Sequence, residues 1–79
     1  MESKMKTVYI IVEYEENNGY GFPLAFATCD KAMKQLRMVA KKEELSVVCN
    51  DPSDKSTSRL AYIQLDEFTT LEMFPLEIK

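Results

Sequence analysis

The first third of the chain contains two short apolar segments separated by a polar turn. Residues Thr7 to Tyr14 are rich in β-branched and aromatic side chains and are too few for a typical helix, which predicts a strand. The polar segment that follows, Glu15 to Gly19, ends in Asn-Gly, a pair that favours the positive φ values of a two-residue hairpin turn. We therefore expect an antiparallel hairpin whose second strand covers Tyr20 to Ala27.

From Asp30 onward the apolar residues recur with a helical period. The apolar positions fall within about a third of a helical wheel, which is typical of an amphipathic helix; they are Ala32, Met33, Leu36, Val39 and Ala40. Thr28 or Asp30 can cap the first amides, and Lys41 and Lys42 suit the negative end of the helix dipole. We expect this helix to end near Glu44.

Three strands are predicted in the remainder of the chain, over Leu45 to Cys49, Leu60 to Leu65 and Thr69 to Ile78. The polar, turn-forming segment Asn50 to Ser58 predicts an exposed, mobile loop. In the last strand the apolar parity changes across Pro75, so we expect either a bulge there or a strand that ends at this proline.

The predicted order is strand, strand, helix, strand, strand, strand. This order indicates a single α+β domain over residues 1–79, in which one amphipathic helix lies on one face of a mainly antiparallel sheet of four to five strands. Residues 1–6 are charged and unpatterned, and we expect them to be a frayed terminus. Because one helix covers one face, the other face must be polar or must meet a second molecule.

The hairpin register predicts which residues share a face. With Asn18-Gly19 as a two-residue turn, Val8, Ile10, Val12 and Tyr14 lie opposite small residues that include Ala25 and Ala27, and we assign that face to the core. The large apolar residues then lie on the other, uncovered face; they are Tyr9, Ile11, Phe22, Leu24 and Phe26. Pro23 places the second strand at a sheet edge. A one-residue slip would exchange the two faces.

An uncovered apolar face predicts an interaction surface, so we expect a protein partner or a homodimer. The alternative is that these aromatic side chains fold over the back of the sheet or pack under a loop. A second candidate surface is the basic helix stripe, formed by Lys34, Arg37 and Lys41 with Met38 beside them, whose spacing places them along one side of the helix. This stripe can meet phosphates or carboxylates, and the alternative is an ordinary solvated helix face.

The amino-acid composition excludes most catalytic mechanisms. The chain has 79 residues, no histidine, two cysteines and a net charge of −3. Without histidine there is no imidazole base or metal ligand, and the sequence has no phosphate-binding glycine motif or paired metal-ligand motif. We therefore expect no enzyme, no catalytic residue, no cofactor and no metal, and the negative charge disfavours nucleic acid as a partner. The longest apolar run is too short for a membrane span, which predicts a cytoplasmic protein.

The segment from Thr7 through Leu36 carries a resemblance. VYIIVEY is followed by a turn, by FPLAFAT and by DKAMKQL. This order resembles small uncharacterised bacterial and phage α+β proteins that place a strand, an F-x-T-x-x-K-A segment and a helix in succession. The resemblance implies a small accessory or mobile-element protein and transfers no catalytic residue.

The function that we expect is that of a non-catalytic protein-interaction module, such as a phage or mobile-element inhibitor that occupies a host protein. One alternative is a nucleic-acid-binding accessory protein that uses Lys34, Arg37 and Lys41 with aromatic side chains stacked on bases. Another alternative is the regulatory subunit of an enzyme.

Overall fold

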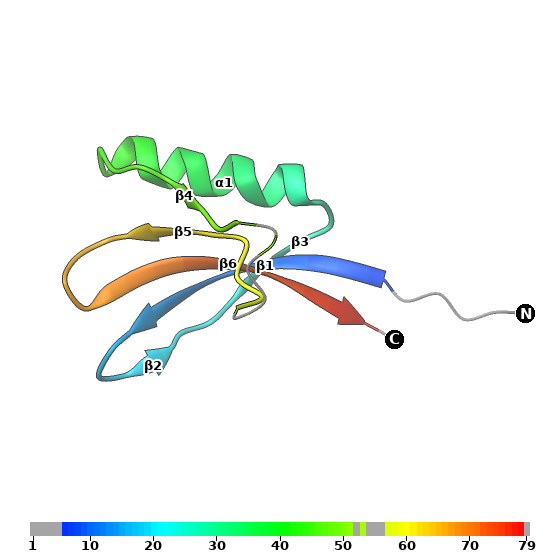
Figure 1. Ribbon diagram of the computed structural model, residues 1–79, viewed down its shortest axis with the longest axis horizontal. Coiled ribbons are helices and arrows are strands. Elements are labelled where there is room, and N and C mark those ends of the chain that lie inside the picture. Colours follow the sequence, from blue (N-terminus) through cyan, green and yellow to red (C-terminus); the bar gives the residue numbers. More distant parts are fainter. Residues whose placement is uncertain (1–5, 52, 54–56, 79) are drawn as a thin grey trace, which may run out of the picture.

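One helix lies across one face of an antiparallel sheet (Figure 1). The computed structural model describes residues 6–51, 53 and 57–78. The elements in chain order are β1 (Lys6–Glu15), β2 (Gly19–Tyr20), β3 (Leu24–Phe26), α1 (Cys29–Lys42), β4 (Val48–Cys49), β5 (Ala61–Gln64) and β6 (Thr69–Ile78). The α+β class is confirmed, although the predicted second strand is two strands. In the described part of the chain no helix has the length and apolar character needed to cross a membrane.

The centre of the sheet is a long antiparallel pair. β1 and β6 are paired from Lys6 opposite Ile78 to Glu15 opposite Thr69. The strand order is β2, β1, β6, β5, β4, with β3 also paired to β1. The predicted bounds of the last strand are confirmed. The two short strands β2 and β3 form one edge of the sheet, which confirms the edge position predicted for the segment around Pro23.

The hairpin turn is longer than the predicted two-residue turn. Tyr14 pairs with Tyr20 and Glu15 with Gly19, so Glu16 to Asn18 form the loop. The Asn18 N–H donates to the Glu15 carbonyl over 3.1 Å, and Gly19 adopts a φ of 77°. A type I′ turn requires a positive φ at Asn18 as well as at Gly19. Among the described residues other than glycine, only Glu44 has a positive φ, so Asn18-Gly19 does not form this turn.

A bulge follows between β2 and β3. Tyr14 pairs with Tyr20, and Ile11 pairs with Leu24. Between these two pairs the outer strand contains one residue more than β1, so one of its residues has no partner. The Gly21 N–H donates to the Glu13 carbonyl over 2.8 Å at this point. The longer turn shifts the side chains of the outer strand to the opposite face, and the bulge shifts them back. Tyr9 therefore lies opposite Phe26, which confirms that these two side chains share a face, as predicted.

The helix covers the face that the sequence predicts to be open. Ala32, Leu36 and Ala40 of α1 are buried against Ile11 of β1. Three further residues complete this core, namely Ala61 and Ile63 of β5 and Met73 of β6. The predicted assignment of faces is therefore wrong. The small residues that let the helix approach are alanines on α1 and Ala61 on β5, whereas Ala25 lies on the far face of the sheet.

Both ends of α1 are capped by local hydrogen bonds. The N-cap is Thr28, which is one of the two residues predicted for this role. Its Oγ1 accepts a hydrogen bond from the Lys31 N–H over 3.2 Å. At the other end the Leu45 N–H donates to the Ala40 carbonyl over 2.8 Å, while Glu44 takes a φ of 58°. This pattern is a Schellman motif, which ends the helix and turns the chain toward β4.

β6 passes through Pro75 without a bulge. The register with β1 is continuous across this residue, so both predicted interpretations, a bulge and an early strand end, are wrong. Leu71 and Met73 face the helix, whereas Leu76 and Ile78 face the other side. The first half of β6 thus presents its apolar side chains to the helix, and the second half presents them to the uncovered face. The pairing of β6 with β5 ends at Met73, so the missing N–H of Pro75 interrupts no strand pairing.

Candidate functional site

The face of the sheet away from the helix carries a continuous apolar surface. Its side chains come from the central strands β1 and β6 and from β2, and we call them the open-face patch: Val8, Ile10, Tyr14, Tyr20, Phe74, Leu76 and Ile78. Tyr20, Leu76 and Ile78 are 59%, 48% and 47% exposed, and the others are half-buried. No helix among the described residues covers this surface (Figure 1).

Three aromatic rings shape the middle of the open-face patch. The ring centroids of Tyr14 and Tyr20 lie 4.8 Å apart, and Tyr20 meets Phe74 edge to face at 6.4 Å. Beside the rings of Tyr20 and Phe74 lies a hollow of about 320 Å³, which is lined by Ile10, Val12, Tyr20, Gly21, Pro23 and Phe74. The patch therefore has a recess that can receive one protruding side chain.

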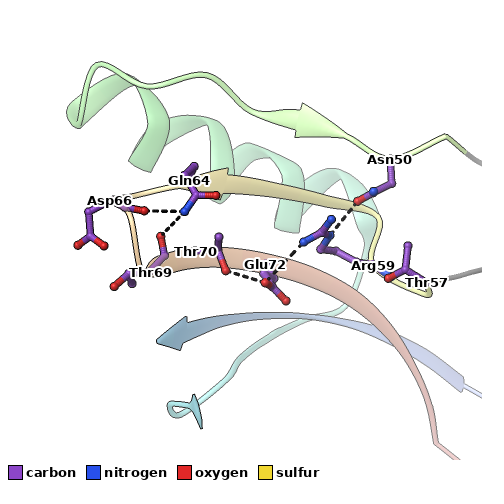
Figure 2. Close-up of polar contacts among 8 residues, drawn as sticks. All are labelled: Asn50, Thr57, Arg59, Gln64, Asp66, Thr69, Thr70 and Glu72. Atoms are coloured by element: carbon purple, nitrogen blue, oxygen red, sulfur yellow. Dashed lines mark hydrogen bonds and ion pairs between the residues drawn. The ribbon is translucent and has the colours of Figure 1, made fainter. Parts of the chain in front are cut away.

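A polar network borders the open-face patch on the β5 side (Figure 2). Glu72 of β6 is only 7% exposed, accepts from Thr70 Oγ1 over 2.6 Å and pairs with Nη1 of Arg59 at 3.6 Å. Arg59 also donates from Nε to Asn50 Oδ1 over 3.1 Å, and its guanidinium carbon lies 4.0 Å from the centroid of the Tyr62 ring. Each charge of the network thus has an opposite charge beside it.

The environment of Tyr20 at this border disfavours ionisation of its hydroxyl. Desolvation, followed by the negative charge of Glu72 and the proximity of Tyr14, raises the pKa of Tyr20 above its usual value of 10.0. Arg59 opposes this shift. The open-face patch as defined contains no acidic or basic side chain. The network pairs an acid with a base and offers neither a nucleophile next to a general base nor a set of metal ligands.

The residues predicted to bind a partner are divided among three places. Tyr9, Ile11 and Phe26 lie under α1, and Ile11 is only 3% exposed, so the prediction that their face is uncovered is wrong. Leu24 and Phe22 are 56% and 99% exposed at the edge of the sheet formed by β2 and β3. The members of the basic helix stripe, Lys34, Arg37, Met38 and Lys41, are all exposed on α1. Their binding of a partner stays a prediction.

A second hollow lies between the helix and the sheet, and we call it the helix groove. It has a volume of about 570 Å³, and its apolar lining includes Ile11, Leu24, Val39, Leu65 and Leu71. Phe22 and Gln35 also line it, together with three carboxylates, those of Glu13, Glu43 and Asp66. The helix groove and the open-face patch are on opposite sides of the sheet.

Sequence reasoning missed the residues that form the open-face patch on β6. The signal was present, because Phe74, Leu76 and Ile78 differ in parity from Leu71 and Met73. The sequence analysis interprets that change as a bulge or as a strand end at Pro75, whereas it marks a strand whose second half presents apolar side chains to the uncovered face. Glu13 was a second overlooked signal, since a carboxylate on the helix-covered face of β1 indicates that the helix leaves a solvent-filled groove there.

No group of three or more potential metal-ligating acids, cysteines or histidines occurs within residues 6–51, 53 and 57–78. Cys29 is half-buried and Cys49 exposed, and both are free thiols. No protein-family model matches the chain, and neither the curated proteins nor the solved structures gave a match. The resemblance to small bacterial and phage proteins stays a prediction.

Proposed function

We propose that this chain is a non-catalytic protein-interaction module that binds another protein through the open-face patch. The observation that carries the proposal is the apolar strip formed by β1, β2 and β6 on the face opposite the helix. Tyr20, Leu76 and Ile78 each expose about half of their surface to solvent, at 59%, 48% and 47%. Contiguous exposed apolar surface on a small protein is characteristic of a docking site.

The geometry defines the chemistry of the partner. Because the patch is uncharged and its polar border is internally paired, a partner gains most by presenting an apolar, uncharged face of its own. The hollow between Ile10, Tyr20 and Phe74 favours a partner with one protruding aromatic or aliphatic side chain, which would be the central anchor of the contact. Such a module acts by occupying a surface of the other protein.

Nucleic-acid binding receives less support from the arrangement. A single strand is held by cations that follow its backbone next to aromatic rings that stack on its bases. Here the basic helix stripe is on α1, whereas Tyr14, Tyr20 and Phe74 lie on the sheet face away from α1. One strand cannot contact both sets of side chains without passing around the sheet.

Site-directed photo-crosslinking in cells of the source organism tests the proposal. A photoreactive phenylalanine derivative replaces Leu76, and we expect a covalent adduct with one partner protein. Phe74→Glu in the same chain should abolish the adduct, because it places a carboxylate in the apolar contact. Ser46→Glu adds the same charge at an exposed residue outside the open-face patch, and should leave the adduct unchanged.

Three results would overturn the proposal: no adduct, an adduct with a second copy of this chain, or an adduct that Phe74→Glu leaves intact. Circular dichroism of both variants shows whether they keep the fold. If Phe74→Glu does not fold, Tyr20→Glu replaces it, since Tyr20 is the most exposed member of the patch at 59%.

A further inference from the structure

Two surfaces on the helix side of the molecule are complementary in charge, and each has an apolar centre. We propose that copies of this chain associate by inserting Met38 and its flanking lysines from one copy into the helix groove of another copy. This contact is separate from the open-face patch, which lies on the other side of the sheet, and it does not depend on the proposed function.

The lining of the helix groove is complementary to an apolar side chain that has positively charged side chains beside it. Ile11, Val39 and Leu71 are buried or half-buried and form an apolar floor. Glu13, Glu43 and Asp66 are exposed and place three carboxylates at its rim. No lysine or arginine is among the described residues that line it. The ion pair seen in the described part of the chain joins Arg59 to Glu72, remote from this groove.

The basic helix stripe has the complementary composition. Met38 is 58% exposed, and Lys34 and Lys41, four residues before it and three residues after it, are its neighbours on the helix surface. Lys42, four residues after Met38, adds a third cation. An unbranched methionine adapts its shape to irregular apolar hollows, and lysine side chains reach outward to carboxylates. The stripe therefore presents an apolar projection surrounded by cations.

Met38 does not line the groove of its own copy. Successive residues of a helix are about 100° apart around its axis, so Met38 projects about 100° away from the neighbouring Val39, which lines the groove. The occupant must come from another molecule. Since this chain itself carries an apolar projection with three adjacent lysines, and the groove offers three carboxylates around an apolar floor, a second copy satisfies both requirements.

The contact joins unlike surfaces, and each copy carries one of each. Association of this kind can be repeated from copy to copy. The open-face patch stays free in such an assembly, because it lies across the sheet from both contact surfaces. Several patches are then displayed together, which strengthens the binding of a partner that has more than one matching site.

Sedimentation equilibrium of the full chain tests this inference. We expect species larger than the monomer whose fraction rises with protein concentration and falls when sodium chloride is raised from about 50 to about 500 mM, because salt screens the lysine–carboxylate pairs. Met38→Glu should lower the association constant about tenfold, the typical effect of removing a central apolar anchor. Ser46→Glu makes the same change in charge at an exposed residue outside both surfaces and should have no effect.

A mixing experiment identifies the two surfaces. Glu13→Lys alters the groove and Met38→Glu alters the projection, so each variant alone should associate about tenfold more weakly than the unchanged chain. An equimolar mixture should form one-to-one pairs, because each variant keeps the half of the contact that the other has lost. A chain that is monomeric at all concentrations, or a mixture that does not pair, overturns the inference. Association that Phe74→Glu abolishes and Met38→Glu leaves intact also overturns it, because that contact would belong to the open-face patch.

Discussion

The two faces of the sheet differ in what covers them rather than in how apolar they are. On the helix side Ile11, Ile63 and Met73 are at most 3% exposed. On the other side Tyr20 and Leu76 of the open-face patch are 59% and 48% exposed, although they too are large apolar or aromatic residues. The comparison teaches that apolar content does not decide which face a single helix covers. Small residues on both elements, Ala32 and Ala40 on α1 and Ala61 on β5, permit close packing on the covered side.

The largest expected effect concerns the covered face. Leu36 is fully buried at the centre of the contact between helix and sheet. Leu36→Ala should lower the free energy of unfolding by about 3 kcal/mol, within the range measured for buried leucines. Urea denaturation measures this loss. Met38→Ala is the matched control two residues along the same helix, and should change stability by less than about 0.5 kcal/mol. Equal losses in the two variants would contradict the assignment of faces.

An intermediate effect is expected at the polar border of the open face, because Glu72 is the one strongly buried charge among the described residues, at 7% exposure. Arg59→Met leaves this carboxylate without its cation and should cost about 1–2 kcal/mol, less than for a fully buried pair because the Arg59 side chain is 26% exposed. A double-mutant cycle with Glu72→Gln measures the coupling. Additive effects of the two substitutions would show that the pair is not coupled, contrary to our prediction.

The smallest effect on stability is expected in the open-face patch itself. Leu76→Ser removes an apolar side chain that is already 48% exposed, and should change the free energy of unfolding by less than about 0.5 kcal/mol. Thermal denaturation checks this value. In the crosslinking experiment, with the photoreactive residue moved to position 78, the same variant should lose most of its adduct. A large stability loss would show instead that Leu76 belongs to the core of the monomer.

Local patterns in the sequence predict much of the fold. The apolar period predicts α1 and its buried face, the bounds of β6 are correct, and Thr28 is one of the two predicted caps. The grouping of Tyr9 with Phe26 also holds, because the longer turn and the bulge at Gly21 to Pro23 cancel in parity. Each of these features depends on residues close together in the chain, where backbone preferences and periodicity carry the information.

The candidate site could not be predicted in the same way. Both faces of β1 are apolar, so the alternation in this strand contains no information about which face meets the helix. Asn50, Arg59 and Glu72 are far apart in the sequence, and the pairings of β5 with β4 and with β6 bring them together. The helix groove likewise combines residues of α1, β1 and β6. These features depend on tertiary contacts, which a local pattern does not specify.

The two internal prolines of the sheet have a consequence for aggregation. A strand with free backbone donors along its edge recruits further strands and can grow into fibrils. Pro75 removes a donor from β6 beyond the end of its pairing with β5, Pro23 interrupts the β2–β3 edge, and the β4 edge, Val48–Cys49, is two residues long. The molecule can therefore expose a large apolar sheet face to water while its edges resist strand addition, which restricts its contacts to side chains.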